Sequence, residues 1–436
     1  MEPSRAGPCG RVLRGRATPP GPTPPPASRK VLGYTSDVLD LIANLVVPNQ
    51  TKIVLLSLDG LGGLPDLRTG RSELETARLP HLNGLAARAA CGLIRHVAPG
   101  ITPGSGPGHL GLFGYDPLAY RVGRGVLEAL GIEFDLHPGD VAARGNFCTI
   151  DDRGLITDRR AGRISTETCM RLTDRLRAVR LPGVEVFVEP VREHRFVLVL
   201  RGTGLKAHLS ETDPQAVGTA PLPVRALDAD SESTAGLVNR FVDDARRRLA
   251  DAAPANMVLL RGFDQLSELP RFPEVFRLRA AAIAAYPMYR GLARLVGMEV
   301  LKTGGTFTDE VATLRQHWEA ADFFFVHYKD TDKAGEDGDF PAKVAALERL
   351  DAFLPEIEAL GPDVLAVTGD HASPAVLAGH GWQPVPVMLW SRYCGADPVT
   401  AFTERACVGG SLGVIAAQHL MPLVMANALR LTKFGA

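Results

Sequence analysis

The chain has 436 residues and a formal net charge of −1 at pH 7. Its hydrophobic content of 45% is typical of a globular protein with a large core, and its length suggests two or three domains. The near-zero net charge argues against binding of nucleic acid or an anionic membrane through overall positive charge. Its six cysteines form no CxxC pairs, which argues against a disulfide framework or a thiolate zinc site and favours a cytoplasmic location.

The first 35 residues differ in composition from the rest. They are rich in proline and arginine, so residues 1–35 are predicted to be a disordered tail. The segment lacks the apolar core of a signal peptide, while a transit peptide and an over-extended gene start both remain open. A short helix is expected over 36–47. No run reaches the roughly 18 apolar residues of a membrane helix, so no membrane partner is expected.

Three apolar runs, at 52–60, 322–332 and 364–374, end in polar residues and are predicted to be buried strands of a parallel sheet. Ligands bind at the carboxyl ends of such strands, so the polar residues there are expected to converge. Carboxylates mixed with imidazoles suit Zn²⁺ or Mn²⁺, and carboxylates alone also suit Mg²⁺. A single Asp after a strand is more often a turn residue, so the hypothesis depends on the whole set. That set is Asp59, Asp332, Glu336, Asp370, His371 and His380, the last of which precedes another apolar run at 384–390.

A glycine-rich segment, residues 100–117, carries Ser105 at its centre. It has no lysine and is therefore not a P-loop. Its pattern indicates a turn that delivers Ser105 to a helix N-terminus, where free N–H groups favour an anion. Beside a divalent cation such a hydroxyl could ionise and become a nucleophile. The alternative is a flexible loop whose serine only caps a helix. His109 follows, with substrate contact and a structural hydrogen bond as equal alternatives.

Helical spacing over 79–93 and 341–358 predicts two helices that pack on the sheet. Between about 124 and 304 the strand candidates, 185–191 and 195–202, are shorter and more alternating. This block is predicted to be an inserted substrate-binding domain, which leaves 36–123 and 305–436 as the core. Arginines are dense near its start, and their forks match phosphate and carboxylate groups, although a single arginine is more often a solvated surface charge.

Over about residues 50–436 the chain resembles the archaeal-type cofactor-independent phosphoglycerate mutases of the alkaline phosphatase superfamily. The stretches that carry the resemblance are LSLDGLGG, TPGSGPGHLGLFGYDP, ARGNFCTID, DRRAGR, YPMYRG, HYKDTDKAGEDGDF and VTGDHASP followed by His380. The resemblance implies an α/β fold, with a mostly parallel sheet core flanked by helices and an inserted α+β substrate domain.

The resemblance also implies two divalent metal ions, Mn²⁺ or Mg²⁺, with Zn²⁺ or Co²⁺ as alternatives. One site would comprise Asp59, Ser105, Asp370 and His371, and the other Asp332, Glu336 and His380. Many relatives have His at the position of Glu336, which leaves the occupancy and metal preference of the second site open. The predicted substrate contacts are Arg144, Asp151, Arg160, Arg163, Arg290, Lys302 and His109.

The implied activity is that of an isomerase, the interconversion of 3-phosphoglycerate and 2-phosphoglycerate. It would proceed through a phosphoserine at Ser105, without 2,3-bisphosphoglycerate. Two alternatives stay open, a metal-dependent phosphohydrolase with the same core and a non-catalytic anion-binding module. The sequence does not determine the oligomeric state.

Overall fold

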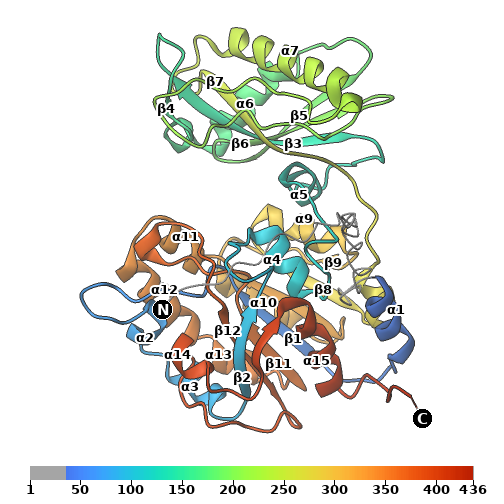
Figure 1. Ribbon diagram of the computed structural model, residues 1–436, viewed down its shortest axis with the longest axis vertical. Coiled ribbons are helices and arrows are strands. Elements are labelled where there is room, and N and C mark those ends of the chain that lie inside the picture. Colours follow the sequence, from blue (N-terminus) through green and yellow to red (C-terminus); the bar gives the residue numbers. More distant parts are fainter. Residues whose placement is uncertain (1–35, 436) are drawn as a thin grey trace, which may run out of the picture. The chain divides into compact units, whose positions relative to one another are not determined.

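The computed structural model describes residues 36–435, and the predicted tail over 1–35 lies outside them. The described chain is an α/β protein with two sheets (Figure 1). The larger sheet has eight strands in the order β13-β2-β12-β11-β1-β10-β8-β9. Its strands are β1 (Ile53–Leu58), β2 (Ala90–Arg95), β8 (Ala280–Ile283), β9 (Glu299–Val300), β10 (Phe323–Tyr328), β11 (Val364–Thr368), β12 (Val385–Ser391) and β13 (Gly413–Ala416).

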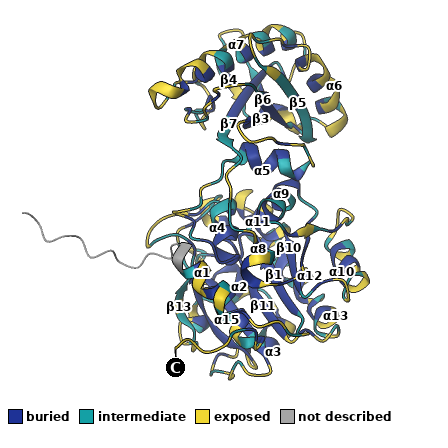
Figure 2. Ribbon diagram, turned by 90° about the vertical axis from the view of Figure 1, so that its right-hand side faces the viewer, coloured by how far each residue is buried: buried dark blue, intermediate teal, exposed yellow. Residues whose placement is uncertain are grey.

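Neighbouring strands of this sheet run parallel, except that β12 is antiparallel to both β11 and β2. The predicted mostly parallel sheet is therefore confirmed. The packing of β1 on both faces explains why its sequence is continuously apolar. Ile53 and Leu55 pack in one core cluster, while Val54 and Leu56 pack in another, so both faces are covered. Each such side chain contributes about 1.5–3 kcal/mol through burial. The central strands are accordingly buried along their length (Figure 2).

Helices cover both faces of the larger sheet. One face is covered by α1 (Ser36–Leu45), α4 (Ser105–Leu112), α8 (Phe272–Phe276), α9 (Pro287–Leu295) and α15 (Leu420–Asn427). The other is covered by α2 (Glu73–Thr76), α3 (Pro80–Ala86), α10 (Phe307–Gln316), α12 (Phe340–Asp351), α13 (Leu354–Glu358) and α14 (Glu404–Cys407). Within residues 36–435 no helix has both the length and the apolar character needed to cross a bilayer.

Two predicted helices differ from the structure. The helix expected over 79–93 is wrong in its second half, because α3 ends at Ala86 and residues 90–95 form β2 between β12 and β13. A short buried apolar run is compatible with either structure, and strand pairing decides between them. The helix expected over 341–358 is divided into α12 and α13. Pro355 lies in the first turn of α13, where a proline is tolerated but could not continue the preceding helix.

The second sheet has five strands, and all of its pairs are antiparallel. They are β3 (Val141–Ile150), β4 (Ile156–Asp158), β5 (Glu185–Arg192), β6 (Arg195–Arg201) and β7 (Met257–Gln265). α6 (Thr166–Leu176) and α7 (Glu232–Leu249) pack on one face, and α5 (Arg124–Gly131) packs on the other. The domain division stays a prediction. β8 and β9 fall inside the range 124–304 but pair in the larger sheet, which favours a shorter insert.

Four short 3₁₀ helices and α11 complete the secondary structure of the described residues. They are η1 (Ala161–Arg163), η2 (Ala229–Ser231), η3 (Ala375–Leu377), η4 (Ala417–His419) and α11 (Asp330–Glu336).

Candidate active site

The carboxyl ends of three neighbouring strands form the candidate site. β1 lies between β11 and β10 in the sheet, Asp59 follows β1, and α11 directly follows β10. The structure brings the expected side chains together in two groups whose ligand atoms lie within 4.8 Å of one another. One group is Asp59, Asp370 and His371, and the other is Asp332, His371 and His380. The convergence expected from parallel strand ends is therefore present, with His371 in both groups.

The distances within the two groups are short. His371 Nε2 lies 3.2 Å from Asp59 Oδ1 and 3.3 Å from Asp370 Oδ2. His380 Nε2 lies 3.6 Å from Asp332 Oδ1, and its ring stacks on that of His371 with centroids 3.7 Å apart. Glu336 is more peripheral. Its side chain is about half exposed, and its Oε1 lies 3.7 Å from His380 Nε2 without joining either group.

Ser105 is the first residue of α4, as the glycine-rich pattern predicts. Its Oγ lies 3.2 Å from His371 Nε2. The preceding Gly104 has no side chain to cap the helix, so the first N–H groups of α4 are left for another acceptor, such as an anion. Gly108 lets this helix approach the strand ends, because a Cβ there would lie 2.2 Å from the carbonyl oxygen of Asp370.

His109 lies one turn beyond Ser105 and is fully buried. Its Nδ1 lies 2.9 Å from the carbonyl oxygen of Ser105 and 3.1 Å from Asp370 Oδ2, and its Nε2 lies 3.0 Å from Ser57 Oγ. These contacts favour the structural role over direct contact with substrate.

The carboxylate oxygens fit a cation. Asp59 Oδ1 and Asp370 Oδ2 are buried and form no hydrogen bond with any described residue. Imidazole nitrogens lie 3.1–3.3 Å from them, but not in hydrogen-bonding geometry. Leaving buried carboxylate oxygens unpaired is costly, and a bound cation removes that cost. A mixed set of carboxylates and imidazoles suits Mn²⁺ or Zn²⁺.

The electrostatic field of the carboxylates at the candidate site favours positive charge there. Burial opposes ionisation of Asp59, but Lys329 and the imidazoles of His327 and His371 outweigh it and hold the pKa of Asp59 well below its ordinary value. Burial likewise disfavours a charged His371, yet the carboxylates of Asp370, Asp59 and Asp332 raise its pKa to about 9. The same negative field would attract divalent cations.

Comparison with known proteins places this chain in a family. The family model for 2,3-bisphosphoglycerate-independent phosphoglycerate mutase matches residues 86–256. A relative from Thermus thermophilus, named "Probable 2,3-bisphosphoglycerate-independent phosphoglycerate mutase", is 49% identical over 405 residues, which are 92% of this chain and 100% of the relative. A relative of the same name from Aquifex aeolicus is 47% identical over 409 residues, 91% of this chain and 100% of its own. The chain belongs to this phosphoglycerate mutase family.

Solved structures agree with this assignment. A Pyrococcus horikoshii protein matches with a TM-score of 0.77 and 28% identity, covering 89% of this chain and 100% of its own. A cofactor-independent phosphoglycerate mutase from Thermoplasma acidophilum matches with a TM-score of 0.62 and 31% identity, covering 87% and 100%. The mutase fold therefore extends over nearly all of the described residues.

Three polar residues at this mutase-family site escaped the sequence reasoning. Lys329 Nζ lies 2.8 Å from Asp59 Oδ2, Tyr289 donates its hydroxyl proton to the same oxygen, and Ser373 Oγ donates to Asp332 Oδ1 at 2.5 Å. All three lie in stretches that carry the family resemblance. A lone lysine, tyrosine or serine forms no spaced motif that would mark it as a site residue. Their place within those stretches was therefore the only sign in the sequence that they belong to the site.

A second polar cluster lies on the α5 face of the smaller sheet. Asn146 of β3 and Arg195 of β6 are cross-strand partners, and Arg144 points to the same face as Asn146. The Nε atoms of both arginines and Oδ1 of Asn146 are buried without a hydrogen bond to any described residue. Arg144 Nε lies 3.6 Å from Glu128, and Arg195 donates to the Tyr286 hydroxyl at 2.6 Å. Arg195 was not predicted. Buried guanidinium groups whose Nε–H lacks a hydrogen-bond acceptor suit a carboxylate ligand.

The other predicted substrate contacts do not join this cluster, and their role stays a prediction. Asp151 is exposed and accepts hydrogen bonds from its own turn, and Arg290 donates to the carbonyl oxygen of Gly131. Arg160 is exposed, and Arg163 pairs with Asp337 at 3.3 Å. Lys302 is also exposed.

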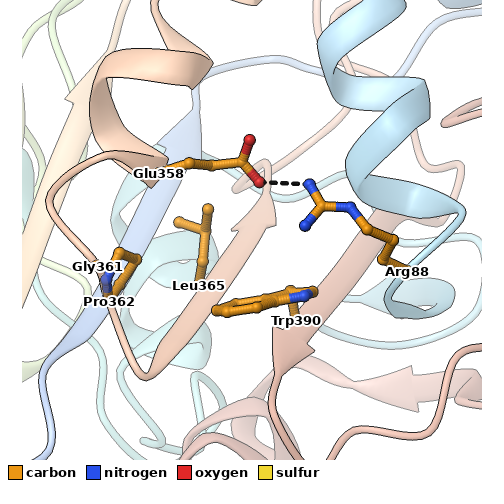
Figure 3. A pocket seen from close by; sticks show the side chains of 6 residues that line it. All are labelled: Arg88, Glu358, Gly361, Pro362, Leu365 and Trp390. Carbon is orange, nitrogen blue, oxygen red and sulfur yellow. Dashed lines mark hydrogen bonds and ion pairs between the residues drawn. The ribbon is translucent and has the colours of Figure 1, made fainter.

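A separate pocket lies at the other end of the sheet (Figure 3). Leu365 near the start of β11 and Trp390 near the end of β12 line it, beneath an ion pair between Arg88 and Glu358 at 2.7 Å. Asp370 and His371 follow the opposite end of β11, so this pocket is not part of the candidate site.

Proposed function

We propose that the protein is a cytoplasmic isomerase that interconverts 3-phosphoglycerate and 2-phosphoglycerate through a phosphoserine at Ser105, without 2,3-bisphosphoglycerate. One observation carries the proposal. The Ser105 hydroxyl is held at a helix N-terminus, 3.2 Å from His371, among buried carboxylates whose unpaired oxygens suit a cation. Full-length relatives that are 47–49% identical and bear the mutase name support the same reaction.

The residues proposed to hold two divalent cations, Mn²⁺ or Mg²⁺ in the first instance, are those predicted from the sequence. Asp59, Ser105, Asp370 and His371 would hold one cation, and Asp332, Glu336 and His380 the other. When bound, such ions supply positive charge that stabilises the oxygens of a transferring phosphoryl group.

In the first half-reaction, Ser105 Oγ attacks the phosphorus of 3-phosphoglycerate. The bond from Oγ to phosphorus forms while the bond from phosphorus to the C3 oxygen breaks, and the proton of the serine ends on that oxygen, which yields glycerate. In the second half-reaction the C2 hydroxyl oxygen of glycerate attacks the phosphorus of the phosphoserine. The bond from the C2 oxygen to phosphorus forms while the bond from Oγ to phosphorus breaks, and the proton of the C2 hydroxyl ends on Ser105 Oγ, which yields 2-phosphoglycerate. The free N–H groups at the start of α4 stabilise negative charge that develops on Oγ.

Glycerate must stay bound and reorient between the two half-reactions. The cluster of Arg144, Asn146 and Arg195 would hold its carboxylate through charge-assisted hydrogen bonds. A mutase also has to keep water away from the phosphoserine, because hydrolysis would release inorganic phosphate. This requirement separates the proposal from the alternative of a metal-dependent phosphohydrolase.

A coupled assay tests the proposal. Purified protein is mixed with 3-phosphoglycerate and enolase, with and without Mn²⁺ and in the absence of 2,3-bisphosphoglycerate, and phosphoenolpyruvate is followed by its absorbance. Inorganic phosphate is measured in parallel. Formation of phosphoenolpyruvate with little free phosphate is expected. Phosphate release without phosphoenolpyruvate would identify a phosphohydrolase, and inactivity with every divalent ion would favour the non-catalytic module.

A further inference from the structure

The two oxygens of the Asp59 carboxylate have different surroundings. Oδ2 accepts hydrogen bonds from the Tyr289 hydroxyl and from Lys329 Nζ, the latter at 2.8 Å. Oδ1 is buried without a hydrogen bond and lies 3.2 Å from His371 Nε2. A carboxylate oxygen has two lone-pair positions, so the two donors occupy those of Oδ2. Only Oδ1 is therefore left to meet a cation.

Lys329 also meets Asp332 of the second group, where both carboxylate oxygens accept a hydrogen bond. Its Nζ lies 2.5 Å from Asp332 Oδ2, while Asp332 Oδ1 accepts a hydrogen bond from Ser373 Oγ at 2.5 Å and lies 3.6 Å from His380 Nε2. One ammonium thus joins a carboxylate of each group, but of these two carboxylates only that of Asp59 keeps an oxygen, Oδ1, without a hydrogen-bond donor among the described residues. Among residues 36–435, Lys329 is the only lysine or arginine that forms an ion pair with Asp59, Asp332 or Asp370. Lys329 directly precedes α11. Its Nζ also lies 3.1 Å from the Tyr289 hydroxyl oxygen, so Asp59, Asp332 and Tyr289 together hold the ammonium in place.

We propose that Lys329 is a positioning residue that determines metal specificity, because together with the Tyr289 hydroxyl it reserves Oδ2 of Asp59, so that this carboxylate offers only Oδ1 to a cation. This inference rests on the proposed function, because it assumes that the two groups bind divalent ions. Ca²⁺ takes six to eight oxygen ligands and often uses both oxygens of a carboxylate, whereas smaller ions are satisfied by fewer ligands. The arrangement consequently selects Mn²⁺ or Mg²⁺ over Ca²⁺.

The positive charge of Lys329 and the carboxylate oxygen that it occupies predict different effects on metal binding. The ammonium of Lys329 repels every divalent cation to a similar extent, so its removal through charge alone would tighten Mn²⁺ and Ca²⁺ equally. The release of Asp59 Oδ2 from the ammonium would instead favour Ca²⁺ selectively, because Ca²⁺ often uses both oxygens of a carboxylate. The ratio of the two dissociation constants therefore reports the reserved oxygen of Asp59 and cancels the effect of charge.

The experiment uses the full chain stripped of metal with a chelator. Dissociation constants for Mn²⁺ and for Ca²⁺ are measured by isothermal titration calorimetry for the wild type and for Lys329→Met. The variant is expected to shift the ratio of the constants toward Ca²⁺, because Asp59 can then offer its second oxygen to that ion. Lys333→Met changes an exposed lysine of α11, the helix that follows Lys329, and should leave the ratio at its wild-type value. Lys329→Gln retains a hydrogen-bond donor and serves if the methionine variant does not fold, with a smaller shift expected.

Unchanged ratios in folded Lys329→Met or Lys329→Gln, with both metals still bound, would overturn the inference and leave the proposed function intact. The inference and the proposed function would both be supported by two results together. The wild type would bind Mn²⁺ and catalyse the mutase reaction, and the variants would show a ratio of dissociation constants shifted toward Ca²⁺. If the wild type bound no divalent ion, the inference and the proposed function would both be overturned. That result is distinguishable from an unchanged ratio of the Mn²⁺ and Ca²⁺ dissociation constants.

Discussion

Gly108 offers a stringent test of the site, because it is the residue that lets α4 approach the strand ends. A Cβ at position 108 would lie 2.2 Å from the carbonyl oxygen of Asp370, about 1.2 Å short of the 3.4 Å of an ordinary contact. The added Cβ is bonded directly to the backbone of α4, and the oxygen belongs to the backbone of Asp370. Neither atom can rotate away, so Gly108→Ala must move α4 away from Asp370. Ser105 lies one turn earlier on the same helix and should move with it, away from His371. A misplacement of about 1 Å is expected to lower kcat on the order of 100-fold, and overpacking should destabilise the fold by about 1–3 kcal/mol.

The measurements are kcat in the enolase-coupled assay and thermal unfolding followed by circular dichroism. Gly106→Ala is the matched control, since it adds the same methyl group to the same helix. Its Cβ would meet only a leucine methyl, Leu127 Cδ1, at 3.4 Å. The control should keep most of its activity. A folded Gly108→Ala variant with wild-type kcat would show that the distance between Ser105 and His371 does not govern the reaction.

Three further predictions concern the proposed nucleophile, the proposed second metal site and a buried acid. Ser105→Ala should bring turnover below detection while the circular dichroism spectrum stays unchanged, because the serine packs little core; near-normal activity would exclude a phosphoserine. Glu336→Ala should lower the number of divalent ions retained after dialysis, measured by mass spectrometry of the metal, and an unchanged number would exclude Glu336 as a ligand. Glu310 of α10 accepts a hydrogen bond from the Ala285 N–H at 2.8 Å, and burial raises its pKa from 4.5 to about 8. The folded protein therefore keeps a proton that the unfolded chain loses, and stability falls as the pH rises from about 4.5 to about 8. Glu310→Gln, which stays neutral, should raise the melting temperature above about pH 8 but not below about pH 4.5, and an equal effect at both would contradict this assignment.

Much of the site could be predicted from the sequence, for a physical reason. A strand buried on both faces must be apolar throughout, so a polar residue directly after it is conspicuous. Asp59, Asp370 and His371 stand out in this way, and parallel strands bring such residues to one edge. The glycine-rich segment likewise marked the start of α4 at Ser105, because close backbone approach requires the absence of a side chain.

Other features depend on partners that no local pattern encodes. Lys329 and Tyr289 meet Asp59 across 270 and 230 positions of the sequence, so neither their spacing nor their residue type announces the contact. Arg195 looked like the ordinary start of an alternating strand until pairing with β3 placed it opposite Asn146.

The sequence by itself determined the central buried strands β1, β10 and β11, the start of α4 at Ser105 and the polar residues at the strand ends, because burial and backbone approach constrain composition locally. Only the tertiary structure decided that residues 90–95 are a strand, that β8 and β9 belong to the larger sheet, and that His371 lies in both ligand groups. These features arise from pairing between distant segments. Hydrophobic periodicity reports which face of an element is buried, but it does not report which neighbour buries it.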